Sequence, residues 1–246
     1  MKLIEVNSVT KEYARGFYAL KNLTFSVEEG SFVSIVGPFG CGKTTVLNLL
    51  GGITEDYIGN IKIRGENPVN TRKTKKIGYV FQKPALLPWR NVIRNITLPL
   101  EISGIKGSEK AYDLLKIVKL GYAAEKMPHE LSRGMQQLIS IARGLILDPD
   151  VLLLDEPFCS IDEINRAKMQ NRLLEIHKQT NKTTLLVTHS LSEAVYLSDQ
   201  IIILTARPAK VKRIIDIDFQ ERNEEVFFSE KFLNYLKIIK VELSNE

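Results

Sequence analysis

A glycine-rich run at residues 37–44 has the residue types and spacing needed to bind phosphate groups. In order, these residues are Gly37, Pro38, Phe39, Gly40, Cys41, Gly42, Lys43 and Thr44. Glycines let successive backbone N–H groups curl around a phosphate, and the start of a following helix adds positive dipole. The Lys43 ammonium can neutralise phosphate oxygens, and the Thr44 hydroxyl can bind Mg²⁺. The run therefore predicts a nucleotide-phosphate site that also includes Thr45.

A pair of carboxylates, Asp155 and Glu156, follows the apolar run at 151–154. Such a run predicts a buried strand, and α/β sheets place their ligands at the carboxyl ends of strands. We expect Asp155 to hold Mg²⁺ through water. Glu156 is then placed to orient and deprotonate the water that attacks the γ-phosphate of ATP. An ordinary acidic strand end is the alternative interpretation.

These side chains need strands and helices to position them. The apolar segment at 31–36 predicts a strand that ends at Gly37, and a helix should follow from Lys43 to about Leu50. Further strands are predicted at 2–9, 20–27, 60–64, 77–81, 151–154, 184–187 and 200–204, with an extended stretch near 211–217. An amphipathic stretch separates the strands at 151–154 and 184–187, and this alternation indicates a parallel sheet.

Helical spacing dominates the middle of the chain, from about Val92 to Leu147. Within this block Ser132 should cap a helix that runs from Arg133 to about Leu147. Ser190 and Glu193 predict a capping box for a later helix. A last helix from about Ser229 carries an apolar stripe that we expect to pack on the core. The stripe consists of Phe232, Leu233, Leu236 and Ile239.

The composition excludes several classes of protein. Hydrophobic residues make up 44% of the 246 residues and charged residues 26%, which excludes fibrous and wholly disordered chains. No apolar run is long enough to span a bilayer, and residues 1–9 lack a signal-peptide pattern, so we expect a cytoplasmic protein. The two cysteines lie far apart and predict neither zinc site nor disulfide. A net charge of +5 is spread over the chain and does not indicate nucleic-acid binding.

With these motifs in order, the sequence resembles the nucleotide-binding subunit of ATP-binding-cassette (ABC) transporters over nearly its whole length. The further motifs behind the resemblance are Tyr13 as the adenine-stacking aromatic, Gln82 as the Q-loop glutamine, Leu131-Ser132-Arg133-Gly134-Met135 as the signature, Asp162 as the D-loop aspartate and His189 as the switch histidine. Phe17 and Tyr18 are rival candidates for the stacking role. The resemblance implies an α/β fold: a P-loop NTPase core with a mostly parallel sheet, an N-terminal antiparallel β subdomain and a helical insertion subdomain.

The resemblance also implies a domain layout and roles for the site residues. It implies one ABC ATPase domain over 1–246, with a core at 1–90 and 148–220, a helical subdomain at about 91–147 and a C-terminal helix at about 221–246. Gln82 would reach Mg²⁺ and the attacking water, and His189 would hydrogen-bond the γ-phosphate. Two copies would pair head to tail on ATP, so that Ser132 and Gly134 of one copy close over ATP bound to the other.

Finer features are similar to the import ATPases for nitrate, alkanesulfonates, taurine and pyrimidine precursors. They are Gln82 to Arg90, Met135, Glu156-Pro157-Phe158 and the segment Thr205-Ala206-Arg207-Pro208-Ala209-Lys210. This likeness implies a peripheral protein on the cytoplasmic side of the cell membrane. It would bind transmembrane permease subunits through Leu86, Leu87 and Trp89 and, through them, work with a solute-binding protein.

Two residues depart from the family pattern: Phe39 stands where serine is usual, and Arg133 replaces the first glycine of the signature. A scaffold that binds ATP and dimerises with weak hydrolysis is therefore one alternative. A nucleic-acid-associated ABC ATPase is another, although the chain has no coiled-coil insertion and no second cassette. Because Lys43, Asp155, Glu156 and His189 are present, we expect an active ATPase, and because those two features are missing, we expect it not to bind nucleic acid.

Overall fold

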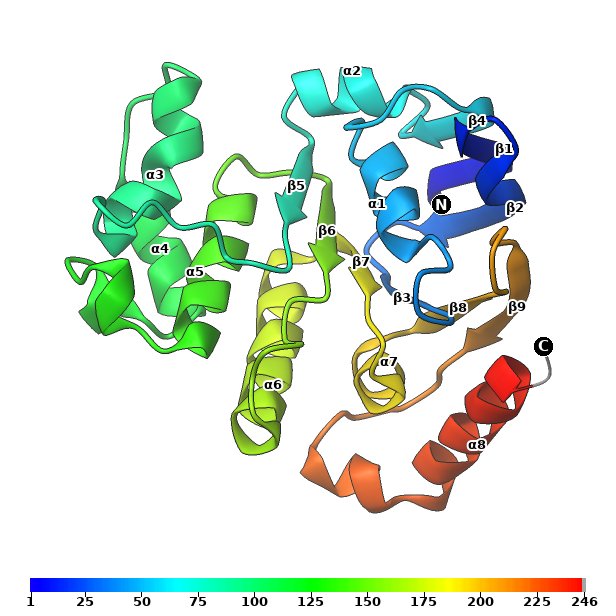
Figure 1. The fold of residues 1–246 in the computed structure, drawn as a ribbon. Coiled ribbons are helices and arrows are strands. Elements are labelled where there is room, and N and C mark those ends of the chain that lie inside the picture. Colours follow the sequence, from blue (N-terminus) through cyan, green and yellow to red (C-terminus); the bar gives the residue numbers. More distant parts are fainter. Residues whose placement is uncertain (245–246) are drawn as a thin grey trace. The chain divides into compact units, whose positions relative to one another are not determined.

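The structure, a computed structural model, describes residues 1–244 and divides the chain into two compact units (Figure 1). The first unit combines Met1–Thr74 with the described residues from Thr183 onward, and the second unit is Lys75–Lys182. The last two residues of the C-terminal segment predicted for about 221–246 lie outside the described residues. The predicted layout of core and helical subdomain stays a prediction.

The first unit holds an antiparallel sheet in the order β2-β1-β4, which confirms the predicted N-terminal β subdomain. In the same unit β3 pairs in parallel with β7 and with β8, and β9 returns antiparallel to β8. The strands are β1 (Lys2–Ala14), β2 (Phe17–Glu28), β3 (Phe32–Val36), β4 (Ile58–Ile63), β7 (Thr183–Val187), β8 (Gln200–Leu204) and β9 (Val211–Asp216). The predicted α/β fold with a mostly parallel sheet is therefore confirmed.

The parallel strands β3 and β7 are the fully buried strands at the centre of this pairing. All five residues of β3 and all five of β7 are buried, as expected for strands covered on both faces of a parallel sheet.

The helices of the unit are α1 (Lys43–Leu50), α2 (Pro68–Lys73), α7 (Leu191–Leu197) and α8 (Glu230–Ser244), with a 3₁₀ turn at Glu224–Phe228. Helix α2 was not predicted from the sequence, although Asn67 caps it and Pro68 begins it, which are ordinary start signals.

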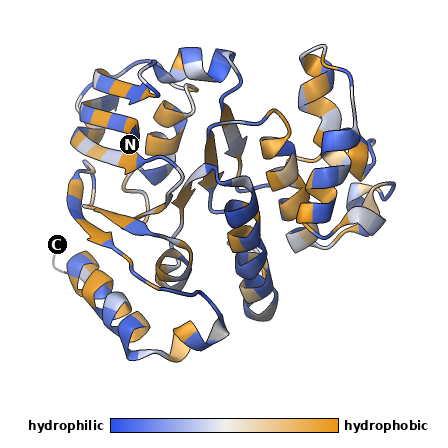
Figure 2. Ribbon diagram, turned by 180° about the vertical axis from the view of Figure 1, so that it is seen from behind, coloured by the Kyte–Doolittle hydropathy of each residue, from blue (hydrophilic) through white to orange (hydrophobic). Residues whose placement is uncertain are grey.

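Hydrophobic and hydrophilic residues are interspersed along α8 (Figure 2), and fewer of its apolar residues are buried than predicted. Phe232 and Ile239 are buried, whereas Leu233 is 55% exposed, so its place in the core was predicted wrongly. Residues 232 and 239 lie seven positions apart, almost two full turns, while residue 233 is rotated by about 100° from 232. Rings anchor the helix to its unit: Phe227 lies 5.1 Å from Phe232 and 4.4 Å from Tyr196 between centroids.

The second unit contains a parallel strand pair, β5 (Ile77–Val80) with β6 (Val151–Asp155). Its helices are α3 (Val92–Ile102), α4 (Glu109–Ile117), α5 (Arg133–Leu145) and α6 (Glu163–Thr180), with 3₁₀ turns at Gly121–Ala123 and Pro128–Glu130. The helical texture predicted between 92 and 147 is thus several short helices. Gly78 allows α5 to approach β5 closely, because a Cβ there would lie 2.4 Å from the Gly144 carbonyl oxygen.

Among residues 1–244, none of the helices combines the length and apolar character that crossing a membrane would require.

Candidate active site

The glycine-rich run forms the predicted loop between β3 and α1 in the first unit. The Lys43 ammonium lies inside it and donates to the carbonyl oxygens of Gly37 and Pro38, each at 2.9 Å. Gly42 has φ +127°, a conformation that side-chain-bearing residues rarely adopt. Among the described residues, no side chain caps the start of α1, so the first backbone N–H groups of this helix are suited to binding an anion. The loop can therefore cradle phosphate.

Phe39 does not fill this loop. Its ring is fully exposed, while Lys43 is 7% exposed and occupies the interior. The bulky ring therefore points outward into solvent. The family's serine is replaced without crowding the lysine.

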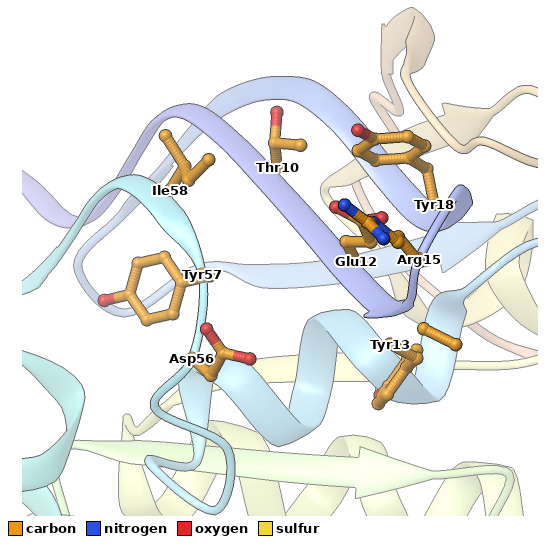
Figure 3. Close-up of a pocket in the computed structure, with 9 residues that line it drawn as sticks. Thr10, Glu12, Tyr13, Arg15, Tyr18, Asp56, Tyr57 and Ile58 are labelled. Carbon is orange, nitrogen blue, oxygen red and sulfur yellow. The ribbon is translucent and has the colours of Figure 1, made fainter.

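Tyr13 lies next to the start of α1 (Figure 3). Its hydroxyl is 3.2 Å from the Thr45 hydroxyl, and its ring is 52% exposed beside a hollow of about 400 Å³ that Tyr18 also lines. The third candidate, Phe17, has the Arg207 guanidinium over its ring at 4.5 Å. Of the three candidates, Tyr13 is the one whose hydroxyl lies against a residue of the predicted phosphate site, Thr45.

His189 follows β7 in the same unit. Because β3 and β7 are parallel neighbours, the residues after them share one edge of the sheet, and the Thr188 N–H donates to the Ile35 carbonyl oxygen at 3.4 Å. Ser190 caps α7 as predicted, with its hydroxyl accepting from the Glu193 N–H at 3.3 Å. In this described turn the reciprocal half of the predicted capping box does not form: the Ser190 N–H donates to the Thr188 hydroxyl at 3.0 Å, and that hydroxyl donates to the Glu193 carboxylate. These bonds on both sides of His189 fix the turn that presents its exposed side chain.

In the second unit, Gln82 and Glu156 lie together after the parallel strands β5 and β6. The Gln82 Nε2 atom is 3.5 Å from Glu156 Oε2 and 3.2 Å from Cys159 Sγ. Glu156 has φ +45°, a strained backbone conformation of the kind found at functional sites. Asp155, the last residue of β6, is buried. The structure thus brings the predicted base and the predicted Q-loop glutamine together.

The hydroxyl of Tyr79 stays protonated beside these groups. Burial raises the pKa of Tyr79, and the negative charge of Asp155 raises it further. The ring stacks on Phe81, with centroids 4.4 Å apart. Tyr79 therefore places an uncharged side chain near Asp155.

The predicted signature residues begin α5. Ser132 caps this helix as predicted, its hydroxyl accepting from the Met135 N–H at 3.3 Å, and it is exposed together with Arg133. Gly134 is buried, and a Cβ there would lie 3.1 Å from the Met169 sulfur. Arg133 and Gln82 both line a hollow of about 440 Å³ in this unit. Signature and Q-loop are therefore adjacent surfaces of the second unit.

Asp162 caps α6 in the D-loop segment. Its carboxylate accepts from the Asn165 N–H at 3.0 Å and from the Asn165 side-chain amide. The bond from the Asn165 side chain lowers the pKa of Asp162. This carboxylate is therefore ionised at neutral pH.

Two residues missed by the sequence analysis brace the segment 83–90 after Gln82. The Arg143 guanidinium donates to the carbonyl oxygens of Pro84 at 2.7 Å and Ala85 at 2.9 Å, and burial lowers its pKa. The fully buried Asn95 accepts from the Leu87 N–H at 2.8 Å and donates to the Arg90 carbonyl oxygen at 2.8 Å. A polar residue at a core position of a predicted helix was the available signal for Asn95. In the segment braced in this way Trp89 is 72% exposed, whereas Leu86 and Leu87 are half-buried.

The predicted site residues divide between the units. The first unit holds Tyr13, the loop from Gly37 to Thr45, and His189; the second unit holds Gln82, Ser132, Gly134, Asp155 and Glu156. No cluster of three or more His, Cys, Asp or Glu side chains in the described part of the chain could hold a metal ion. The predicted Mg²⁺ ligands Thr44, Gln82 and Asp155 all offer oxygen, which suits a cation that uses few protein ligands beside substrate phosphates.

Comparison with known proteins gives consistent matches. The family model of the ABC transporter matches residues 20–159. An aliphatic sulfonates import ATP-binding protein of Bacillus cereus is 39% identical over 216 residues, or 87% of this chain and 85% of the relative. A taurine import ATP-binding protein of Rhizobium johnstonii is 40% identical over 219 residues, or 87% and 82%.

Solved structures agree. A dimeric bacterial ABC transporter cassette superposes with a TM-score of 0.75 at 32% identity, covering 88% of this chain and 99% of that one. A dimeric post-hydrolysis state of an ATP-binding cassette with ADP and Pi superposes with a TM-score of 0.73 at 31% identity, with the same coverage of both chains.

Proposed function

The chain belongs to the ABC transporter family as one of its ATPases, and we propose that it is the ATP-hydrolysing subunit of an importer. The observation that carries this proposal is the identity of about two residues in five with import ATP-binding proteins over 87% of the chain. Lys43, Asp155, Glu156 and His189, on which hydrolysis depends in this proposal, are all present in the sequence. Permease subunits are the membrane partners that such a subunit requires.

In this proposal the phosphate loop binds ATP through its N–H groups and Lys43, with Tyr13 stacked on the adenine. Thr44, Gln82 and Asp155 would hold Mg²⁺, which when bound neutralises charge on the phosphate oxygens. Lys43 already lies inside the loop through its bonds to Gly37 and Pro38. Binding ATP therefore requires little rearrangement of this lysine.

Glu156 takes the proton of the attacking water while the water oxygen forms its bond to the γ-phosphorus and ADP leaves. Gln82, hydrogen-bonded beside Glu156, orients that water. His189 holds a γ-phosphate oxygen from its fixed turn. Two copies close head to tail, with Ser132 and the Gly134 N–H of one copy on the ATP of the other, so that α5 directs its positive end at phosphate.

Coupling to transport runs through the segment 83–90. Its backbone is held by Arg143 and Asn95, its Trp89 side chain is exposed, and Leu86 and Leu87 are half-buried. We place Leu86, Leu87 and Trp89 against permease subunits, which in turn receive solute from a solute-binding protein. The chain would then work peripherally at the cytoplasmic face of the membrane, without nucleic acid.

Steady-state ATP hydrolysis by the purified chain, alone and with its permease subunits in proteoliposomes, tests this function. We expect the membrane subunits to raise the turnover and the loaded solute-binding protein to raise it further. An ATPase rate that no membrane subunit alters would contradict the importer proposal. A chain that dimerises on ATP without measurable turnover would favour the scaffold alternative.

Replacing Trp89 with aspartate should remove the stimulation by the permease while the basal turnover stays unchanged. The indole is exposed, so its loss leaves the core intact, and a carboxylate would disrupt an apolar contact. The measurement is the ratio of ATPase rates with and without permease. Tyr122→Asp is the matched control, because Tyr122 is a 70% exposed aromatic of the same unit and should keep full stimulation. Normal stimulation of Trp89→Asp would show that the docking surface lies elsewhere.

A further inference from the structure

Arg207, in the turn between β8 and β9, contacts the phosphate loop. Its Nη2 atom donates to the Gly40 carbonyl oxygen at 2.7 Å. On the other side, its guanidinium carbon lies 4.5 Å from the centre of the Phe17 ring. One side chain therefore links the phosphate loop to the β1–β2 hairpin, and all of these residues belong to the first unit.

The backbone that carries Arg207 is anchored. The Ala209 N–H donates to the Ala19 carbonyl oxygen at 2.9 Å, and the Lys21 N–H donates to the Ala209 carbonyl oxygen at 3.0 Å. The same part of β2 lies against the loop, since a Cβ on Gly42 would be 3.1 Å from the Ala19 carbonyl oxygen. The guanidinium thus reaches Gly40 from a fixed base.

The contact acts on the backbone group that matters for phosphate. Gly40 has φ +70° and no side chain, so the peptide that follows it can rotate at little cost. In a trans peptide the carbonyl oxygen and the next N–H point in opposite directions. Holding the Gly40 oxygen toward Arg207 therefore fixes the direction of the Cys41 N–H in the loop. In this structure the Cys41 N–H donates to the Pro38 carbonyl oxygen at 3.3 Å, which closes a turn over residues 38–41.

Arginine is the residue type that can make this contact. Its planar guanidinium stacks on a ring face while an N–H at its edge donates in a fixed direction. A lysine would supply the charge without the planar stack. A charge-assisted bond of this length is among the stronger hydrogen bonds that a backbone carbonyl accepts.

We propose that Arg207 is a positioning residue for nucleoside di- and triphosphates: with Phe17 behind it, it holds Gly40 so that the phosphate loop is preformed before nucleotide binds. The proposal rests on the nucleotide site proposed above. It assigns a role to the Ala206-Arg207-Pro208 segment, which the catalytic residues leave unexplained.

The test is the affinity of dilute protein for fluorescent ADP and ATP analogues, together with KM and kcat. Arg207→Ala should weaken nucleotide binding about tenfold, because losing one hydrogen bond that involves a charged group lowers the affinity by a factor of that order. KM should rise by a similar factor while kcat changes less, because a preformed loop serves ground state and transition state alike. Arg207→Lys should stay close to alanine, and Phe17→Leu should shift affinity in the same direction.

Arg213→Ala is the matched control, because Arg213 is an exposed arginine on β9 of the same unit, paired with Glu242. It removes the same charge and should bind nucleotide as the wild type does. Full affinity in Arg207→Ala would overturn the proposal, and full rescue by Arg207→Lys would show that only charge matters. A wild-type protein that binds no nucleotide would instead overturn the proposed function, and this inference with it. Circular dichroism identifies any variant that fails to fold, in which case Arg207→Lys and Phe17→Leu decide.

Discussion

Lys43→Ala should lose ATP binding by about 10² to 10⁴-fold, the largest effect on affinity expected for this chain. The ammonium lies inside the phosphate loop, and its contacts to the β- and γ-phosphates are charge-assisted bonds of about 1.5–3 kcal/mol each. Titration of the variant with a fluorescent ATP analogue measures the loss. The residue is buried, so Lys43→Met, which keeps most of the side-chain volume, should behave in the same way.

The control is Lys62→Ala, because Lys62 is an exposed lysine on β4 of the same unit. It should bind ATP as tightly as the wild type. If Lys43→Met also bound ATP normally, the loop between β3 and α1 would not be the phosphate site.

Glu156→Gln should keep ATP affinity and lower the turnover by about 10² to 10⁴-fold. An amide retains the shape and the hydrogen bonds of the side chain but cannot take the proton of the attacking water. Phosphate release under saturating ATP measures the turnover, and analogue titration measures affinity. Glu163→Gln, at the exposed start of α6 in the same unit, is the matched control and should hydrolyse normally. Turnover within a few fold of wild type in Glu156→Gln would assign the base to another residue.

The chemically active segments could be predicted because their residues are contiguous. A loop of glycines between a buried strand and a helix needs no distant partner, so Gly37 to Thr44 follow from local sequence alone. The same holds for Asp155 and Glu156 after an apolar strand. The catalytic roles themselves stay predictions, because they depend on bound ATP and on a second subunit.

Strand ends were harder to predict. β1 continues to Ala14, well beyond its predicted end at residue 9. β2 begins at Phe17, before its predicted start at residue 20. The added residues include charged and exposed side chains, which weaken the alternating pattern, yet backbone pairing such as Ala14 with Phe17 extends the ladder. The turn between them is possible because Gly16 has φ +83°.

The contacts that hold the site in place have no local signal. Arg207 and Gly40 are 167 positions apart in sequence, and Arg143 and Pro84 are 59 apart. Arg207 and Gly40 meet because they follow the neighbouring strands β8 and β3, and Arg143 meets Pro84 because α5 packs beside β5. Likewise the exposure of Phe39 and Arg133 could not be deduced from their departure from the family pattern.

The central claim, that ATP closes two copies of this chain into an active pair, is tested most directly by the molar mass of Glu156→Gln in solution. Light scattering behind size-exclusion chromatography should give the 27.9 kDa monomer without nucleotide and twice that mass with saturating ATP. Adding Lys43→Ala to the same variant should restore the monomer. A Glu156→Gln protein that binds ATP yet stays monomeric at high protein concentration would contradict the account.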